Sequence, residues 1–197
     1  MNKEDIFKKL SQKYSSPEKV QKYLRSLKYN NEENGETLRS ALQTYKSKKL
    51  HCLEAAFLAA AILEHNGYPP LIMSLESIDN LDHVIFVYQK NGKWGSVARS
   101  RDEGLHGRKA VFKSPRELAL SYSEPYIDKT GCITGFQVVN LDESKSNWRF
   151  SLRNVWKAEN FLIELKHVSI VFNRTRYQRT HRSYLEGVKA KRQAFWL

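Results

Sequence analysis

The chain has few cysteines, no long apolar run and a deficit of acidic residues, and each shortage narrows the class of protein. Two cysteines among 197 residues, Cys52 and Cys132, argue against a disulfide scaffold and fit a reducing compartment. No apolar run approaches the length that crosses a bilayer, and the first residues lead into an amphipathic segment instead of the apolar core of a signal peptide. We therefore expect a soluble, cytoplasmic protein.

Motifs for metals and nucleotides are also missing. The sequence has no C-x-x-C or H-E-x-x-H pattern, which would suggest a zinc site, and neither of the glycine-rich loops that cradle phosphates. We therefore expect no metal site and no cofactor.

The shortage of acids is greatest near the carboxyl end. The formal net charge is +12, and residues 146–197 hold eleven basic and three acidic side chains, so eleven minus three places eight of these charges there. This excess could serve solubility alone, or it could contact nucleic acid, an acidic partner protein or an anionic membrane surface. Tyr177, His181 and Tyr184 are interleaved with the basic residues, a pattern found where proteins contact nucleic acids.

The most informative stretch that is present runs from His51 to Pro70. Between Leu53 and Leu63 the only polar side chain is Glu54, and a helix that is apolar on all sides is a buried helix. Gly67 supplies a stop signal at its carboxyl end. Cys52 falls at its start, where free backbone N–H groups and the helix dipole favour ionisation of a thiol.

The remaining pattern predicts an α+β fold, with helices first, an antiparallel sheet next and helices last. Amphipathic spacing predicts helices over 3–14, from Ser16-Pro17 onward and over 37–48. A capping box at Ser114 opens another helix, and Ser151 is the candidate cap of one more. Strands are expected over 71–75, 83–88, 94–98 and 133–141, with a hairpin turn at Asn91-Gly92. We expect one domain over 1–145 and a basic, mostly helical extension over 146–197, packed on that domain.

A thiol at a helix start can serve as a nucleophile if an imidazole takes its proton and a third group orients the imidazole. His83 is the best candidate base, because it opens the first long strand after the Cys52 helix. Packing of that helix on the sheet would bring the two ends together. The third group should lie on the adjacent strand and point to the same face as His83.

These residues resemble a known family. Cys52-x-x-Ala55, the alanine-rich helix, Gly67-Tyr68-Pro69, the strand from Asp82-His83 and Gly92-Lys93-Trp94 are similar to the transglutaminase-like core of the papain-like cysteine enzymes. The resemblance covers roughly residues 40–100. It implies a papain/transglutaminase-like fold and a Cys–His pair that acts on an amide or peptide bond through a thioester.

The third family position differs in this chain. The resemblance places an Asp four residues after the Trp, where this sequence has Ala98. Asp102 is the next acid in phase, and Ser96 or Ser100 shares the same parity. Asp82 adjoins His83 but should point to the opposite face of the strand. The orienting group is therefore Asp102, Ser96 or Ser100, or it is missing.

Other side chains near the thiol have simpler interpretations. We expect His51 to point away from Cys52, His65 to cap the carboxyl end of the helix, and His106 to line a loop over the site or lie on the surface. The oxyanion hole would use the backbone N–H of Cys52, with Gln43 or Tyr45 as the candidates for the second donor.

Two functional hypotheses follow. The first is a cysteine protease, amidase or transglutaminase-like acyltransferase that acts on a peptide or protein amide, with Cys52 as the nucleophile and His83 as the base. The second is an inactive member of the same fold, with Ala98 marking the loss of catalysis, which binds nucleic acid or an acidic protein through its basic 146–197 region.

Overall fold

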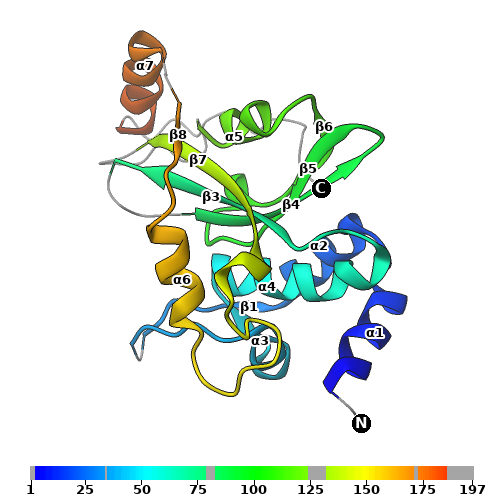
Figure 1. Ribbon diagram of the computed structural model, residues 1–197. Coiled ribbons are helices and arrows are strands. Elements are labelled where there is room, and N and C mark those ends of the chain that lie inside the picture. The colour runs from blue at the N-terminus through cyan, green and yellow to red at the C-terminus, as the bar shows by residue number, and fades with distance from the viewer. Residues whose placement is uncertain (1–2, 34, 79–82, 124–131, 171–172, 186–197) are drawn as a thin grey trace.

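The computed structural model describes residues 3–33, 35–78, 83–123, 132–170 and 173–185 (Figure 1). The helices are α1 (Lys3–Lys13), α2 (Pro17–Ser26), α3 (Ala41–Ser47), α4 (Cys52–Leu63), α5 (Pro115–Ser123), α6 (Trp156–Ile163) and α7 (Arg174–Leu185). The strands are β1 (Lys28–Tyr29), β2 (Lys49–Leu50), β3 (Leu71–Ser77), β4 (His83–Lys90), β5 (Lys93–Val97), β6 (Arg108–Phe112), β7 (Ile133–Asn140) and β8 (Val168–Ser169). The fold is α+β, as predicted.

The main sheet has the strand order β6-β5-β4-β3-β7-β8, and each pair of neighbouring strands is antiparallel. Helix α4 runs across one face of this sheet with α2, α3 and α1 around it, while α5 covers the other face (Figure 1). The short strands β1 and β2 form a separate parallel pair, in which Tyr29 lies opposite Leu50. This pair fixes the chain immediately before Cys52.

The buried helix predicted from the sequence is confirmed as α4, which begins at Cys52 and ends at Leu63. Ten of its apolar residues, from Ala55 to Leu63 together with Leu53, form the centre of the core on its side of the sheet. At the far end Gly67 adopts a positive φ of 82°, which a glycine accommodates without strain and which ends the helical segment.

Side-chain caps set where several helices begin. Ser16 accepts a hydrogen bond from the backbone N–H of Lys19, and Pro17 occupies the first turn of α2, as the sequence predicts. The helix expected over 37–48 begins only at Ala41, because Ser40 caps it by accepting from the N–H of Gln43. Ser151 does not cap α6: its hydroxyl accepts from the N–H of Arg153, and α6 starts later, at Trp156.

Four strands and one strand end were not predicted from the sequence. The strands are the two-residue pair β1 and β2, strand β6, which begins at Arg108 and pairs with β5, and strand β8. Strand β8 is only two residues long and exposed, so it carries no sequence pattern. Strand β3 continues to Ser77, two residues beyond its predicted end at 75, because it stays paired with β7. The turn at Asn91-Gly92 has the expected positive φ values of 52° and 69°.

The first part of the 146–197 region belongs to the same core as α4. Trp148 is fully buried and its ring lies 6.1 Å from that of Phe57, measured between centroids. The N–H of Ala41 donates to the carbonyl of Trp148, and the N–H of Val155 donates to that of Leu38. Beyond Leu185 the basic tail lies outside the described residues. Among the described helices, none is both long and apolar enough to cross a membrane.

Candidate active site

Cys52 occupies the first position of α4, directly after the β1–β2 pair. Its side chain is half-buried and it is not part of a disulfide. The first N–H groups of a helix have no partner inside the helix, and the dipole places positive charge there. The fold therefore sets the sulfur at the position where a negative charge costs least.

His83 opens β4 and is almost fully buried. Its Nε2 lies 3.0 Å from the carbonyl oxygen of Leu105, so Nε2 carries the hydrogen and donates it to that carbonyl. The imidazole also shares a hydrogen bond with the thiol of Cys52, which leaves Nδ1 to face the sulfur. The ring meets that of Tyr122 edge-on, with 5.9 Å between centroids. The structure thus brings together the two residues that the sequence predicts as nucleophile and base.

A second imidazole also contacts the thiol, and this contradicts the expectation that His51 points elsewhere. His51 is the N-cap residue of α4, its Nε2 lies 2.9 Å from the carbonyl of Thr37, and its ring hydrogen-bonds to Cys52. Burial acts to lower the pKa of His51, but the hydrogen bond and charge of Cys52, with the charge of Glu54, raise it to about 9. The signal that could have revealed His51 is its place at the N-cap, where a side chain turns back over the first turn.

The two imidazoles determine the ionisation of the thiol. Burial acts to raise the pKa of Cys52, but hydrogen bonds from His51 and His83, and the positive charge on these rings, hold that pKa well below its ordinary value. A lowered pKa increases the share of thiolate at neutral pH, and the thiolate is the nucleophilic form of cysteine.

Glu54 fixes the first turn of α4 from inside the core. This fully buried carboxylate accepts from the backbone N–H groups of Arg39, at 2.9 Å, and His51, at 3.2 Å. It forms an ion pair with the guanidinium of Arg39 at 3.3 Å, and its Oε1 lies 3.7 Å from the His51 ring. The carboxylate therefore holds the loop before α4 and favours the charged form of His51.

The structure assigns the orienting contact of His83 to a backbone atom. Asp102 is exposed at the start of a short 3-10 turn (Glu103–Leu105), where its N–H donates to Ser100 Oγ. Ser96 is buried, and its hydroxyl bonds to Tyr122 Oη at 2.6 Å. None of the described hydrogen bonds joins these three predicted side chains to the His83 ring, whose Nε2 faces Leu105. Asp82 lies outside the described residues.

Ala98, at the position where the sequence resemblance predicts an Asp, lies in the core, and its backbone is held by hydrogen bonds. The amide side chain of Gln21 donates to the Ala98 carbonyl at 2.8 Å and accepts from its N–H at 2.9 Å. The methyl group packs among apolar side chains of the α5 face, including Leu105. A backbone carbonyl has no residue-type signature, so no sequence pattern could have pointed to Leu105 as the partner of His83.

Arg108 supports the turn that carries this carbonyl. Its buried guanidinium donates to the carbonyls of His106, at 2.6 Å, and Gly104, at 2.7 Å, on either side of Leu105. Its Nε donates to Ser121 Oγ, and its guanidinium carbon lies 4.1 Å from the centroid of the Tyr122 ring. Burial lowers the pKa of Arg108. This arginine therefore holds in place the turn whose Leu105 carbonyl accepts the hydrogen bond from His83.

The residues expected to complete the oxyanion hole are used elsewhere. Gln43 donates its amide N–H to the carbonyl of Leu152, and the ring of Tyr45 lies beneath the ammonium of Lys48, 3.8 Å from its centroid. The backbone N–H of Cys52, at the start of α4, is still the predicted first donor of the oxyanion hole. His65 lies exposed within the short 3-10 turn Glu64–Asn66, beyond the end of α4.

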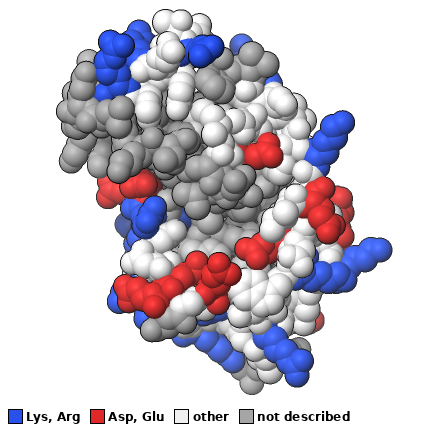
Figure 2. All heavy atoms as spheres, turned by 90° about the vertical axis from the view of Figure 1, so that its left-hand side faces the viewer, with Lys and Arg blue, Asp and Glu red and all other residues white. Residues whose placement is uncertain are grey.

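Acidic side chains lie on one side of the thiol. Glu159 interacts electrostatically with Glu32 and Glu36, and it also interacts with His51 and Cys52. Burial and these neighbouring acids raise the pKa of Glu159. Figure 2 shows acidic side chains gathered across the lower half of the face that carries α6, while the lysines and arginines seen there lie mainly toward its margins.

The described residues contain no cluster of three or more His, Cys, Asp or Glu placed to hold a metal ion. No protein-family model matches the chain, and a search of curated proteins finds no match either.

The exposed part of α7 lies away from α4 (Figure 1), and its contact with nucleic acid or an acidic partner stays a prediction.

Proposed function

We propose that this protein is a cysteine enzyme that acts on an amide bond through a thioester, with a transglutaminase-like arrangement of nucleophile and base. The observation that carries the proposal is the hydrogen bonding of one thiol, at the start of a buried helix, to two imidazoles. A structural core cysteine needs neither an imidazole nor a lowered pKa. Perturbed ionisation together with such geometry is typical of catalytic groups.

The three side chains divide the chemistry. The Cys52 thiolate attacks the amide carbonyl carbon, a C–S bond forms, and the carbonyl oxygen becomes an oxyanion facing the first N–H groups of α4. As the tetrahedral intermediate collapses, the C–N bond breaks and His83 Nδ1 delivers to the leaving amine the proton that it took from the Cys52 thiol. Water then attacks the thioester while His83 takes its proton, which releases a carboxylic acid and restores the thiolate.

His51 has a different role from His83 in this scheme. Its raised pKa of about 9 keeps it an imidazolium throughout the neutral range, so it is a poor proton shuttle and a good fixed partner for the thiolate. His83 is oriented by a neutral carbonyl and is the group that exchanges protons. This division supports hydrolysis of a peptide or protein amide, and an amine in place of water would give acyl transfer by the same steps.

Alkylation of Cys52 by iodoacetamide as a function of pH tests the proposal. We expect rapid modification of Cys52 at pH 7 and below, where an ordinary thiol is protonated, and slow modification of the buried Cys132 in the same molecule. A panel of fluorogenic peptide amides and glutamine donors should be turned over by the wild-type chain and not by Cys52→Ala. A Cys52 that titrates like a free thiol, with no activity lost in Cys52→Ala, would overturn the proposal.

A further inference from the structure

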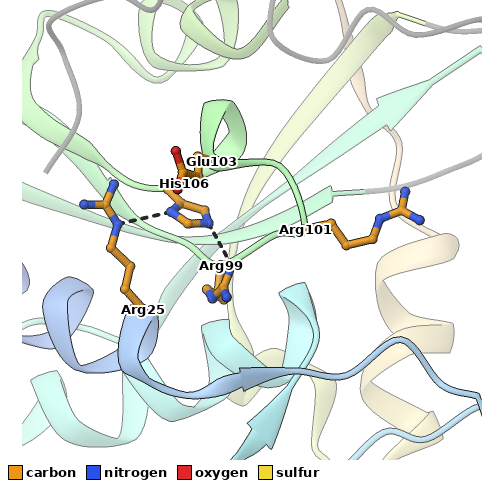
Figure 3. A pocket seen from close by; sticks show the side chains of 5 residues that line it. All are labelled: Arg25, Arg99, Arg101, Glu103 and His106. Atoms are coloured by element: carbon orange, nitrogen blue, oxygen red, sulfur yellow. Dashed lines mark hydrogen bonds between the residues drawn. The ribbon is translucent and has the colours of Figure 1, made fainter.

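Beside the Cys–His pair lies a pocket of about 350 Å³ lined by Arg25, Arg99, Arg101, Glu103 and His106. Figure 3 shows Arg25 rising from α2 and Arg99 from the loop after β5, with both guanidinium groups turned toward the His106 ring, while Arg101 extends away along the rim. Three guanidinium groups and one carboxylate leave an excess of positive charge in this hollow.

The hydrogen bonds inside the pocket do not use all the donors. Arg25 Nε lies 3.1 Å from His106 Nδ1, and Arg99 Nη1 lies 3.0 Å from His106 Nε2. Burial and the charges of Arg99 and Arg25 lower the pKa of His106 to about 4, so the ring is neutral and one nitrogen alone can accept. Only one of the two arginines can therefore donate a hydrogen bond to the His106 ring at a time.

The tautomer decides which donor is left over. His106 Nε2 lies 3.1 Å from the carbonyl of Ser100, which calls for a hydrogen on Nε2 and leaves Nδ1 to accept from Arg25. Arg99 Nη1 then faces an N–H group and retains the Ser100 carbonyl as its acceptor. Its Nε is buried and has no hydrogen-bond partner among the described residues. Arginine has no acceptor atoms, so the unpaired N–H of Arg99 needs an acceptor, such as an oxygen atom of a molecule that enters the pocket.

The pocket and the thiol share structural elements. Arg99 lies over the ring of Tyr29, 5.6 Å from its centroid, and the Tyr29 hydroxyl interacts electrostatically with Cys52. Burial and the charge of Cys52 raise the pKa of Tyr29 to about 12. His106 directly follows Leu105, the residue whose carbonyl holds His83. Only the Tyr29 ring and the short turn that contains Leu105 would therefore separate a molecule in the pocket from the Cys52 sulfur.

We propose that this pocket binds an oxyanion, with a dianionic phosphate group preferred over a single carboxylate, and that it anchors the anionic part of the substrate beside Cys52. Guanidinium groups match the geometry of phosphate and carboxylate oxygens in pairs, and Arg25 and Arg99 present two such groups around a neutral ring. The net positive lining favours the higher negative charge of phosphate. The substrate role rests on the proposed enzyme function, whereas anion binding by the pocket does not.

Titration of the full chain with inorganic phosphate, at low ionic strength and followed by calorimetry and amide NMR shifts, tests the binding. We expect saturable binding with shifts centred on residues 99–106, weaker binding of acetate, and no such response to chloride. Arg99→Gln should weaken phosphate binding by about tenfold, because one charge-assisted contact is lost. The exposed Arg153→Gln removes the same charge elsewhere and should leave binding unchanged.

Arg99→Lys keeps the positive charge but removes the planar guanidinium with its paired donors. We expect this variant to recover only part of the phosphate affinity that Arg99→Gln loses. Equal loss in Arg99→Gln and Arg153→Gln, or no saturable phosphate binding, would overturn the pocket. Acetate binding as tight as phosphate binding would overturn the preference for a dianion.

The substrate role has its own readout in the alkylation of Cys52. Iodoacetate is an anion and iodoacetamide is neutral, so saturating phosphate should slow iodoacetate more strongly than iodoacetamide, and Arg99→Gln should remove that difference. Equal effects on the two reagents would overturn the link to the thiol. A Cys52 inert to both would instead contradict the enzyme function, while the phosphate titration would still decide the pocket.

Discussion

His83 donates its Nε2–H to the carbonyl oxygen of Leu105 across 3.0 Å, so a backbone carbonyl, and not one of the predicted side chains, orients this imidazole. A neutral carbonyl fixes the tautomer and the orientation of the ring, as a carboxylate does, but adds no negative charge to stabilise an imidazolium. In this chain the charged groups beside the thiol are His51 and Glu54, which lie 3.7 Å apart. The Leu105 carbonyl therefore orients His83, while His51 and Glu54 provide the charge.

Arg108 is a positioning residue for this contact, and Arg108→Gln should lower the turnover of amide substrates by about 10–100-fold, because a shift of the Leu105 carbonyl misaligns His83. The buried guanidinium holds the carbonyls on both sides of Leu105. The measurement is the pH–rate profile together with thermal unfolding. The exposed Lys109→Gln is the control, and a variant that loses stability but keeps its profile would show a purely structural role.

Removal of each imidazole should give a different pH profile. His51→Gln should raise the pKa of the Cys52 thiol, because one of its two hydrogen bonds and a positive charge are lost, so alkylation moves to higher pH. His83→Gln should also raise that pKa, but it should additionally abolish amide turnover, since no group then carries the proton to the leaving amine. If His51→Gln loses turnover at every pH while its alkylation profile is unchanged, the division of roles is wrong.

The imidazole of His51 should titrate near pH 9 in an NMR experiment, and Cys52→Ala should lower its pKa, because the hydrogen bond and charge of the thiolate are removed while burial remains. The sign for stability follows from the same shift. A raised pKa contributes stability that is complete below the ordinary value of 6.5 and is lost as the pH rises through about 9. The lowered pKa of Cys52 acts in the opposite sense, so its gain offsets this loss between those values in the wild-type chain. Because Cys52→Ala also lowers the pKa of His51, the loss shrinks together with the gain, and the stability of the variant should change little over that interval.

Glu54→Gln should reduce the free energy of unfolding by about 3–5 kcal/mol, because it leaves the partly buried Arg39 unpaired and weakens the bonds that hold the loop before α4. Chemical denaturation measures the loss. Glu18→Gln is the matched control: Glu18 pairs with Lys90 at 3.4 Å, but both side chains are about half exposed, so its removal should cost no more than about 1 kcal/mol. Similar losses in the two variants would contradict the structural role of Glu54.

Ala98→Asp introduces the carboxylate that the sequence resemblance predicts at this position, and we expect it to destabilise the fold by about 3–5 kcal/mol without raising turnover, because the carboxylate would be buried among apolar groups without a charged partner. The donor of His83 is already used by Leu105. Denaturation and amide turnover are measured on the same variant. A stable, more active Ala98→Asp would show that an aspartate at this position can displace the Leu105 carbonyl.

The sequence by itself determined the parts of the protein that depend on local pattern. The run from Leu53 to Leu63 indicated a buried helix with Cys52 at its start, and the β-branched and aromatic run after His83 indicated a strand whose first residue is that histidine. Caps such as Ser16 and turns such as Asn91-Gly92 are read from a few adjacent residues, because their hydrogen bonds and φ values are local.

Only the tertiary structure decided how the thiol is surrounded. The contact of His83 with Leu105 and the support from Arg108 use backbone carbonyls, which every residue carries, so no residue type marks them. The pairing of Arg39 with Glu54 and the approach of Arg25 to His106 join segments far apart in sequence, and they follow from how α2, α4 and the loop after β5 pack together. Local sequence places the reactive groups at the ends of their elements, and packing fixes their protonation by bringing distant charges and dipoles within hydrogen-bonding distance.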